Sequence, residues 1–324
     1  MRVFINGFGR IGRSVLRAWA QAPQRWPGLE VAGINDIAAP EMCAYLFEYD
    51  SVFGPWRGSV GLEDGALVVD GRVFPLHRTP DIATLPLAGV DVVMECTGRA
   101  DKREVAERGL LAGAGRVLVS GPSAAADLTL VLGANDGELA AQRIVSNASC
   151  TTNALAPLAR LIHDHWGVVT GSMTTIHCYT GSQPTVDAPA ADYPRSRAAA
   201  LSMVPTTTSA QRLLDRVLPQ IAGRIEGSAV RVPTASVSAV DLAVMTERPT
   251  TAAEVNQALR AAGGVIGATD RPLVSTDLRA RPESIVMATP ETRVTAGGML
   301  RVFGWYDNEW GFSNRMLDVA ALMG

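Results

Sequence analysis

The feature that most constrains the fold is a glycine-rich turn that directly follows the first apolar segment. Residues 2–6 (Arg-Val-Phe-Ile-Asn) predict a buried strand, and residues 13–20 place apolar side chains at helical spacing. Between them lie Gly7, Phe8, Gly9, Arg10, Ile11 and Gly12. Gly7 permits a tight turn, Gly9 lets the backbone approach a pyrophosphate, and Gly12 allows the helix to pack closely on the strand. This order predicts the first unit of a dinucleotide-binding domain.

The next apolar strand adds an acidic residue to this pattern. Residues 29–34 lead to Asn35 and Asp36, at the distance from the glycines where dinucleotide-binding domains carry a carboxylate for the adenosine ribose. A carboxylate there repels a 2′-phosphate, so Asp36 favours NAD over NADP. The alternative is a glycine-rich turn in an unrelated α/β protein, followed by an acidic surface loop.

Small polar residues end two later strands of the predicted sheet. Residues 91–96 lead to Thr97 and Gly98, and the strand that begins at residue 116 ends at Ser120. Apolar strands that alternate with helices indicate a parallel sheet covered on both faces, and ligands bind beyond the carboxyl ends of such strands. We therefore expect Thr97, Gly98 and Ser120 to line the cofactor crevice, although small polar residues also end strands for reasons of turn geometry.

Cys150 is the candidate nucleophile of the second half. It lies in the run Ser-Asn-Ala-Ser-Cys-Thr-Thr-Asn (146–153), before apolar residues with helical spacing. A thiol at a helix N-terminus feels the positive end of the helix dipole, which favours the thiolate. His177, at the end of the predicted strand 172–177, is the candidate base of a Cys–His pair. A buried and unreactive cysteine is the alternative.

The other three cysteines are predicted to be structural. Cys43 lies on a predicted helix and Cys96 ends an apolar strand, while Cys178 points away from His177 if both lie on one strand. The chain has no CxxC spacing and no cluster of cysteine with histidine, so we expect neither a disulfide scaffold nor a metal site.

Charge and hydropathy argue against two classes of partner. The 324 residues carry a net charge of −3, which gives no positive field for nucleic acid. No stretch approaches the roughly 18 apolar residues of a membrane span, and the first residues lack the pattern of a signal peptide. We expect a cytoplasmic protein that binds neither nucleic acid nor membranes.

The second half also gathers hydroxyl and guanidinium groups. Thr180, Arg195 and Arg197 lie in one long loop, Pro-Thr-Thr-Thr-Ser follows at residues 205–209, and Arg231 ends a strand. Arginine offers forked donors and threonine adds short hydrogen bonds, so the group suits phosphate and has room for two anions. Taken separately, each arginine is typical of a solvated surface charge.

Seven segments together resemble the phosphorylating glyceraldehyde-3-phosphate dehydrogenase family. They follow in family order from residue 2 to about residue 320: Ile-Asn-Gly-Phe-Gly-Arg-Ile-Gly-Arg (5–13), Asn-Asp (35–36), Glu-Cys-Thr-Gly (95–98), Ser-Cys-Thr-Thr-Asn (149–153), Thr-Thr-Ile-His (174–177), Arg-Val-Pro-Thr (231–234) and Trp-Tyr-Asp-Asn-Glu-Trp-Gly (305–311). Such a series is far more specific than any one motif.

The resemblance implies covalent chemistry with NAD as the cofactor. Cys150 attacks an aldehyde, His177 accepts the hydroxyl proton as hydride passes to the nicotinamide, and inorganic phosphate attacks the resulting thioester to release an acyl phosphate. The resemblance also implies roles for further residues: Thr180 and Arg231 for the substrate phosphate; Ser149, Thr151, Arg195, Thr208 and the backbone amide of Ser209 for the attacking phosphate; and Asn308 for the nicotinamide carboxamide.

Some positions depart from the family pattern. Gly181 and Ser182 replace a usual Asn-Asp, Ser209 stands where glycine is usual, and Phe312 replaces a tyrosine. Phe312 resembles the erythrose-4-phosphate dehydrogenase branch, whereas Thr180 and residues 206–208 resemble the glycolytic branch. We expect glyceraldehyde 3-phosphate as the substrate, with erythrose 4-phosphate as the alternative. A non-enzymatic, NAD-binding regulatory protein is a third interpretation, which the intact Cys150 and His177 oppose.

The predicted fold is α/β, with an N-terminal Rossmann-type doubly wound parallel sheet and a second, mixed α+β catalytic domain. We expect residues 1–149, completed by a C-terminal helix at about 309–324, to form the NAD-binding domain, with one helix at 102–112. Residues 150–308 are expected to form the catalytic domain. The loop at 179–203 resembles the family's S-shaped loop, which reaches a neighbouring subunit's cofactor site, so the resemblance implies a homotetramer.

Overall fold

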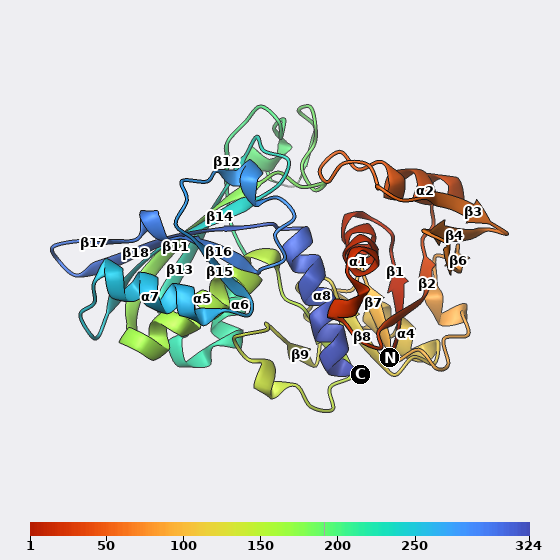
Figure 1. The fold of residues 1–324 in the computed structure, drawn as a ribbon, viewed down its shortest axis with the longest axis horizontal. Helices are drawn as coiled ribbons and strands as arrows, with labels where there is room; N and C mark the ends of the chain where they lie inside the picture. Colours follow the sequence, from red (N-terminus) through yellow and green to blue (C-terminus); the bar gives the residue numbers. More distant parts are fainter. Residues whose placement is uncertain (191) are drawn as a thin grey trace. The chain divides into compact units, whose positions relative to one another are not determined.

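The chain forms two compact units in a computed structural model that describes residues 1–190 and 192–324 (Figure 1). Unit 1 comprises Met1–Leu130, Gly137–Ala148 and Phe312–Gly324, and unit 2 comprises Val131–Asp136 and Ser149–Gly311. The chain therefore enters unit 2 directly before the candidate nucleophile and returns to unit 1 within its last helix.

A seven-stranded sheet forms the centre of unit 1. Its order is β6-β2-β1-β7-β8-β10-β9, and all neighbouring strands are parallel. The strands are β1 (Arg2–Asn6), β2 (Glu30–Asn35), β6 (Leu76–His77), β7 (Val92–Glu95), β8 (Arg116–Val119), β9 (Leu128–Thr129) and β10 (Ile144–Ser146). Strand order runs outward in both directions from β1 and β7, which is the doubly wound arrangement that binds ligands where the order reverses.

Apolar strands explain why this sheet is buried. Val3, Ile5, Val92 and Val93 have no exposed surface, as expected for a parallel sheet covered on both faces. The helices of this unit are α1 (Arg10–Gln21), α2 (Pro40–Glu48), α3 (Arg103–Ala106), α4 (Arg108–Leu111) and, from Phe312 onward, α8 (Trp310–Met323). Strands and helices thus alternate as the sequence predicted, and the Rossmann-type expectation is confirmed.

The single helix expected at residues 102–112 is instead divided into α3 and α4. Backbone hydrogen bonds join Glu107 to Arg103 and Leu111 to Glu107, so the two helices meet at Glu107. Gly109 explains the weakness of a continuous helix here, because glycine costs conformational entropy in a helix interior. It also permits close packing on the sheet, since an added Cβ would lie 2.9 Å from the Val117 side chain.

A small antiparallel sheet is a feature of unit 1 that the sequence analysis did not anticipate. It contains β3 (Val60–Glu63), β4 (Ala66–Val69) and β5 (Arg72–Phe74) in that order. Both connections are Asp-Gly pairs with positive φ at each residue, at 64–65 and 70–71. Asp-Gly pairs with this geometry form the two-residue hairpin turns whose twist matches that of the strands.

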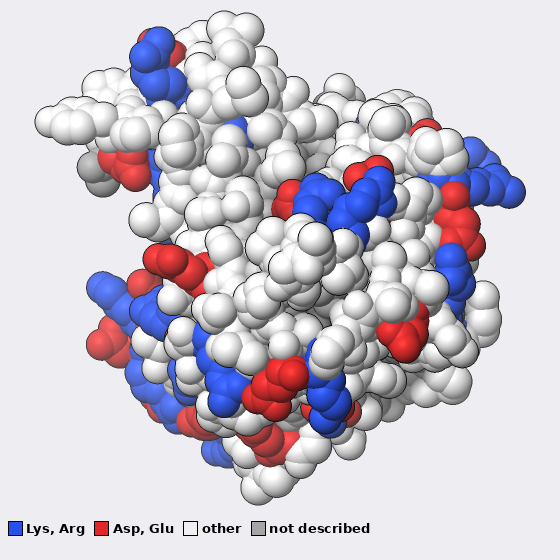
Figure 2. Space-filling view, turned by 90° about the vertical axis from the view of Figure 1, so that its left-hand side faces the viewer, with Lys and Arg blue, Asp and Glu red and all other residues white. Residues whose placement is uncertain are grey.

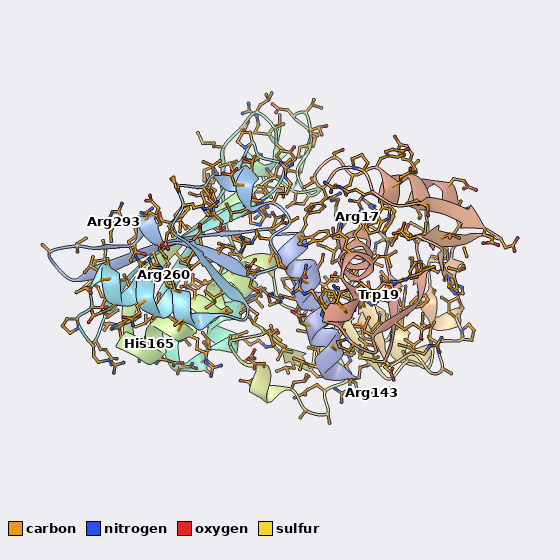
Figure 3. All side chains as sticks on the ribbon, viewed as in Figure 1. Arg17, Trp19, Arg143, His165, Arg260 and Arg293 are labelled. Carbon is orange, nitrogen blue, oxygen red and sulfur yellow. The ribbon has the colours of Figure 1, made fainter. Side chains whose placement is uncertain are left out.

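Helix α1 contributes two large buried side chains to unit 1, Arg17 and Trp19, both labelled in Figure 3. The Trp19 indole N–H donates to the Leu29 carbonyl at 3.1 Å. Arg17 is 2% exposed, and its guanidinium donates to the carbonyls of Phe47 and Gly54. A buried guanidinium needs such acceptors, so α1 and the segment after α2 stabilise each other.

Unit 2 is built on a mixed sheet of eight strands. Their order is β12-β13-β11-β14-β18-β16-β15, with β17 beside β18; the pairs β11–β13 and β15–β16 are parallel and the others antiparallel. The strands are β11 (Val168–Cys178), β12 (Val204–Thr206), β13 (Ile225–Val232), β14 (Ser238–Thr246), β15 (Ile266–Thr269), β16 (Ile285–Ala288), β17 (Arg293–Val294) and β18 (Met299–Tyr306). The helices are α5 (Cys150–Trp166), α6 (Ala210–Val217) and α7 (Ala252–Ala262). This arrangement confirms the mixed second sheet.

Charged side chains of both signs lie next to one another on the face shown in Figure 2. Alternating charges of this kind agree with a net charge of only −3. Among residues 1–190 and 192–324, no helix combines the length and the apolar composition needed to cross a membrane.

Candidate active site and dinucleotide pocket

Unit 1 contains a cavity of about 530 Å³ at the carboxyl ends of its central strands. The residues that line it include four of the predicted cofactor residues: Gly7, Gly9, Asp36 and Thr97. Residues that the sequence analysis did not assign to the cofactor also line it: Asn6, Asn35, Ile37, Thr79, Pro80, Ile82, Cys96, Arg99, Val105 and Arg108. Its volume lies in the range of small-molecule and cofactor sites.

The three glycines of the turn have different surroundings. An added Cβ at Gly7 would lie 2.8 Å from the Cys96 backbone, and one at Gly12 would lie 2.0 Å from the Gly7 carbonyl oxygen. At Gly9, an added Cβ would meet nothing within 4 Å. Gly7 and Gly12 are therefore required by packing, whereas Gly9 faces open space that a bound group can fill. This is the division that a pyrophosphate at the α1 N-terminus requires.

The first turn of α1 is also free of a side-chain cap. Gly9 is the N-cap residue, and no side chain of the described residues caps it. Backbone N–H groups at an uncapped helix N-terminus lack intrahelical partners and attract anions. Together with the open space at Gly9, these donors fit the phosphates of a dinucleotide.

Asp36 occupies the predicted ribose position. Its carboxylate accepts hydrogen bonds from the backbone N–H of Phe8 at 2.6 Å and of Ala38 at 2.9 Å. The carboxylate is thus fixed between the glycine turn and the loop after β2, and it lines the cavity. A fixed acceptor suits the two hydroxyls of an adenosine ribose, so the residues of this cavity fit NAD.

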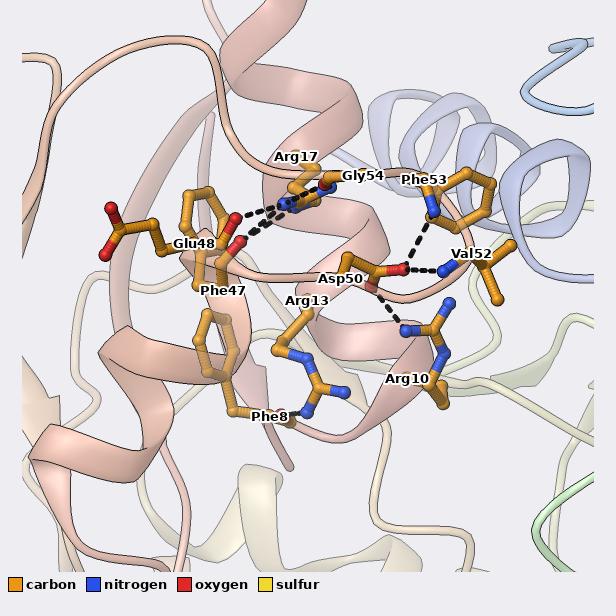
Figure 4. Close-up of polar contacts among 10 residues, drawn as sticks. All are labelled: Phe8, Arg10, Arg13, Arg17, Phe47, Glu48, Asp50, Val52, Phe53 and Gly54. Carbon is orange, nitrogen blue, oxygen red and sulfur yellow. Dashed lines mark hydrogen bonds and ion pairs between the residues drawn. The ribbon is translucent and has the colours of Figure 1, made fainter.

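The other predicted cofactor residues of unit 1 lie outside the lining of the cavity. Arg10 forms an ion pair with Asp50, which also accepts from the backbone of Val52 and Phe53 (Figure 4). The remaining members of this group are Phe8, Ile11, Gly12, Gly98 and Ser120. They shape the turn and the strand ends around the cavity, as Phe8 does through its hydrogen bond to Asp36.

A second cavity of about 350 Å³ lies within unit 2 and contains the candidate nucleophile. It brings together eight of the predicted catalytic and phosphate residues: Ser149, Cys150, Thr151, His177, Arg195, Thr208, Ser209 and Arg231. Thr175, Thr207 and Ala229 also line it and were not assigned. Thr175 alternates with His177 along β11, so the period of two along a strand is the signal by which it could have been found.

Cys150 is the first residue of α5, as its sequence context predicted. Ser149 is the N-cap, and its hydroxyl accepts from the Thr152 backbone N–H at 3.1 Å. This cap fixes the start of the helix at the nucleophile. The cysteine therefore lies at the positive end of a 17-residue helix.

His177 faces the nucleophile from β11. The Cys150 Sγ atom lies 3.5 Å from His177 Nε2, within the distance for a sulfur hydrogen bond. On the other side of the ring, Nδ1 lies 2.6 Å from the Cys178 carbonyl oxygen. The tautomer with the proton on Nδ1 donates to this carbonyl and leaves the Nε2 lone pair facing the thiol, which is the arrangement that a general base needs.

Arg231 lies on the far side of the same imidazole. One guanidinium nitrogen is 2.7 Å from His177 Nδ1, to which it can donate only in the tautomer with the proton on Nε2, and it donates to the Cys178 carbonyl at 3.1 Å. Burial, together with the Arg231 charge, lowers the pKa of His177 to about 4. The imidazole is therefore neutral near pH 7 and able to accept a proton.

The thiol of Cys150 does not have the lowered pKa that its place on the helix led us to expect. Burial raises its pKa, although the Arg231 charge and hydrogen bonds from Thr151 lower it. The loss of hydration raises the pKa of the thiol by more than the helix N-terminus lowers it, because a thiolate is costly to form in a site shielded from water. The resting pair is a neutral thiol beside a neutral imidazole, and the thiolate forms by proton transfer to His177.

A network of hydroxyl hydrogen bonds connects the elements that carry Cys150 and His177. The Tyr306 hydroxyl lies 2.8 Å from Thr151 Oγ1 and 2.8 Å from Thr175 Oγ1. Thr175 in turn donates to the Ala239 carbonyl at 3.0 Å. The network joins the first turn of α5 to β11 and β14, and so fixes the positions of the nucleophile and the base relative to each other.

The predicted residues for the attacking phosphate all line this cavity. Arg195 donates to Thr206 Oγ1 at 2.6 Å and to the Thr207 carbonyl at 3.2 Å. Thr208 accepts from the Ala210 backbone N–H at 3.1 Å, directly before α6. Arg195 is thus held beside the threonine run, where its remaining donors suit an anion.

Two predicted residues are not among the residues that line this cavity. Thr180 lies on the following loop, where its hydroxyl is 2.9 Å from that of Ser182. Asn308 is buried, and its side-chain oxygen accepts from the Cys178 thiol at 3.0 Å.

The three remaining cysteines differ from Cys150 in their surroundings. Burial raises the pKa of Cys43 to about 11, and that of Cys96 and Cys178 to about 12. Cys43 and Cys178 are buried, whereas Cys96 lines the dinucleotide cavity. Of the four cysteines, Cys150 is the one beside a histidine base.

Comparison with known proteins agrees with both cavities. The NAD binding domain of glyceraldehyde 3-phosphate dehydrogenase matches residues 1–103, and the C-terminal domain of that enzyme matches residues 149–308. The glyceraldehyde-3-phosphate dehydrogenase of Cereibacter sphaeroides is 48% identical over 330 residues, which cover 100% of this chain and 98% of that protein. That of Geobacillus stearothermophilus is 43% identical over 330 residues, with coverage of 99% and 97%. The chain therefore belongs to the glyceraldehyde-3-phosphate dehydrogenase family.

Proposed function

We propose that this protein is an NAD-dependent, phosphorylating dehydrogenase that oxidises glyceraldehyde 3-phosphate to an acyl phosphate. The observation that carries the proposal is the pairing of Cys150 with a neutral His177 inside a cavity lined by arginine and threonine side chains. A thiol with a base at 3.5 Å is suited to covalent attack on a carbonyl.

Bond formation begins at the sulfur. His177 Nε2 accepts the thiol proton, the sulfur attacks the aldehyde carbon, and the proton returns to the carbonyl oxygen to give a thiohemiacetal. His177 then withdraws the hydroxyl proton as hydride leaves the same carbon, and a thioester remains on Cys150. NAD, when bound, supplies the acceptor for that hydride.

Phosphate completes the cycle. An inorganic phosphate oxygen attacks the thioester carbon, and the sulfur leaves as a thiolate that recovers a proton. Arg195, Thr208, Ser149, Thr151 and the Ser209 backbone are proposed to hold this phosphate, and their place around the Cys150 cavity supports that role. For the substrate phosphate we propose Arg231 and Thr180, and for the nicotinamide carboxamide Asn308.

A spectrophotometric assay tests this function. Purified protein with NAD and glyceraldehyde 3-phosphate should form NADH, and inorganic phosphate should greatly increase the steady rate because it discharges the thioester. Cys150→Ser should lower the rate by at least about a thousandfold, as loss of a covalent nucleophile does. Cys43→Ser, which removes a buried thiol from unit 1, is the matched control and should retain activity. A parent protein that binds NAD but forms no NADH would be a regulatory protein instead.

Erythrose 4-phosphate is the second substrate to test. Ser182 carries no charge and is exposed, and an added Cβ at Gly181 would meet nothing within 4 Å, so the loop after Thr180 leaves space for a longer aldehyde. If erythrose 4-phosphate has the larger kcat/KM, it replaces glyceraldehyde 3-phosphate as the assigned substrate.

The proposed assembly is a homotetramer in the cytoplasm. Large apolar side chains on the loop at 179–203 are exposed in the single chain: Val186 by 72%, Tyr193 by 94% and Leu201 by 83%. Exposed apolar groups of this size favour contact with another protein surface. Light scattering should give a mass of four 34.2 kDa chains, and a monomer would contradict the assembly.

A further inference from the structure

A buried carboxylate lies behind the wall of the dinucleotide cavity. Glu95, the last residue of β7, is 2% exposed and is not itself a lining residue. Its carboxylate forms no ion pair with any residue in the described ranges 1–190 and 192–324. A buried charge of this kind is costly unless hydrogen-bond donors replace the water that the carboxylate loses.

Every hydrogen bond to the Glu95 carboxylate comes from a residue that lines the cavity. One oxygen accepts from the Asn6 side-chain amide. The other accepts from the Thr97 backbone N–H at 2.9 Å and from the Thr97 hydroxyl. An ionised carboxylate only accepts, so it determines which way each of these groups points.

The orientation continues across the next strand. Because the Asn6 amide nitrogen faces Glu95, its oxygen faces Asn35 and accepts from that side chain at 2.9 Å. The Asn35 side chain then accepts from the Thr79 backbone N–H at 3.0 Å and donates to the Thr79 carbonyl at 3.0 Å. Asn6 is the register partner of both Asn35 and Glu95, so the parallel ladder places the three side chains side by side.

The donor and the acceptor of each hydrogen bond are therefore fixed along one line of residues at the cavity. The line runs from Thr97 through Glu95, Asn6 and Asn35 to Thr79. We propose that Glu95 is a positioning residue for NAD binding: its ionised carboxylate fixes the orientation of these four cavity-lining residues, and affinity for the dinucleotide falls when that carboxylate is neutralised. The proposal rests on NAD being the cofactor and deepens that assignment.

A neutral group at this position cannot satisfy the same donors. Protonated glutamate and glutamine each present one donor in place of an acceptor, so either Asn6 or Thr97 must turn away or lose its hydrogen bond. Thr97 shows the consequence for the cavity, because its hydroxyl proton is directed to Glu95 and only lone pairs remain for other partners. A bound adenosine ribose or base would meet a different pattern of donors and acceptors.

A fall in pH can neutralise the Glu95 carboxylate, because its surroundings raise its pKa. Burial raises the pKa of Glu95, although the hydrogen bonds from Thr97 and Asn6 and the charge of Arg108 lower it. Other ionisable groups near this line are Cys96, next in sequence, His77, the register partner of Asn35, and three residues that line the same cavity, Asp36, Arg99 and Arg108. As pH falls through the raised pKa of Glu95, the charged form disappears and NAD should bind more weakly.

Isothermal titration calorimetry with NAD tests the proposal without reference to catalysis. The parent protein, Glu95→Gln and the control Glu30→Gln are compared between about pH 4 and pH 8, a range that begins below the ordinary pKa of glutamate. Glu30 lies exposed at the opposite end of β2, so its variant removes the same charge from the same sheet. Glu95→Gln should raise the Kd at pH 8 by about tenfold, and Glu30→Gln should leave it unchanged.

The pH profile separates positioning from a simple structural role. The Kd of the parent protein and of Asp36→Asn should rise as pH falls, whereas that of Glu95→Gln should be flat. A parent Kd independent of pH, or a Glu95→Gln protein with the parent's affinity or pH profile, overturns the proposal. Should Glu95→Gln fail to fold, the parent and Asp36→Asn profiles still decide it. A parent that binds no NAD at any pH would instead overturn the assigned cofactor.

Discussion

Cys150 and His177 are both neutral at rest, and the charge of Arg231 lowers the pKa of each. Its charge lies against His177 Nδ1 at 2.7 Å, where it opposes protonation of the imidazole, and it also lowers the pKa of the Cys150 thiol against the effect of burial. One guanidinium thus keeps the base available and makes the nucleophile easier to ionise. This role is separate from any contact with a substrate phosphate.

Substitution of Arg231 by glutamine should move the acidic limb of the rate profile. The pKa of His177 is about 4 because of burial and the Arg231 charge, so removal of the charge raises it. A base with a higher pKa is protonated at higher pH, and the acidic limb of kcat/KM should rise by about one pH unit. Unphosphorylated glyceraldehyde is the substrate for this assay, so that phosphate binding does not contribute.

The control for this prediction is Arg212→Gln, an exposed arginine on α6 in the same unit. Its profile should match that of the parent. An acidic limb that stays in place in Arg231→Gln would show that this charge does not act on the base.

Single residues were predictable where an element boundary identifies them. The place of Cys150 at the start of a helix and of His177 near the end of a strand was predictable from residue types and spacing. The catalytic roles of both residues stay predictions. Asn6, Asn35 and Glu95 were not assigned, because their roles depend on which strands are neighbours and on the register between them. The raised pKa of Cys150 could not be predicted from the sequence, because it results from burial of the thiol in the folded chain.

At the scale of elements, the glycine turn and α1 form one packed unit. The Gly7 carbonyl occupies the space where a Gly12 side chain would lie, and Gly9 leaves its own space open. Two glycines three positions apart in the motif therefore have different surroundings: Gly12 permits close packing, and Gly9 leaves space that a bound ligand can fill.

Gly12→Ala and Gly9→Ala should separate these two roles. The added methyl at residue 12 would lie 2.0 Å from a backbone oxygen, so α1 must shift, and the free energy of unfolding should fall by about 3 kcal/mol. Gly9→Ala should fold with near-parental stability and bind NAD at least about tenfold more weakly. Thermal melts and NAD titrations of both variants measure this. Equal loss of stability in the two variants would contradict the assignment.

Arg17 connects α1 to the end of α2 and to the segment that follows it. Figure 4 shows its guanidinium directed to the carbonyl oxygens of Phe47, Glu48 and Gly54. Arg17→Met fills much of the same space but leaves these carbonyls without their donor. Urea unfolding should give a stability loss of about 3 kcal/mol, while Arg57→Met, at an exposed position, should change stability by less than about 0.5 kcal/mol. A loss in Arg17→Met no larger than in the control would show that the bonds do not stabilise this segment.

Regular elements were easier to predict than their interruptions. The strand at residues 2–6 and the helix that begins at Cys150 were expected where the structure has them. The break between α3 and α4 was not, because a glycine such as Gly109 weakens a helix without determining where the helix is interrupted. The hairpins of β3–β5 were missed although their two Asp-Gly pairs are a local signal.

At the scale of the whole molecule, the chain divides its chemistry between two compact units. Unit 1 contains the cavity that fits NAD, and unit 2 contains the thiol, the imidazole and the arginine and threonine side chains proposed to bind phosphate. The long segment of unit 2 begins at Ser149, directly before the nucleophile. A division of this kind lets one dinucleotide fold serve different chemistries, because the reacting groups come from the second unit.

The most direct measurement is the mass of the peptide that contains Cys150 after a rapid quench. Protein mixed with NAD and glyceraldehyde 3-phosphate in the absence of phosphate should carry one acyl group on Cys150, formed together with one equivalent of NADH. Added phosphate should remove that group while NADH formation continues. Continued NADH formation with no acyl group on Cys150 would contradict a covalent mechanism at this residue.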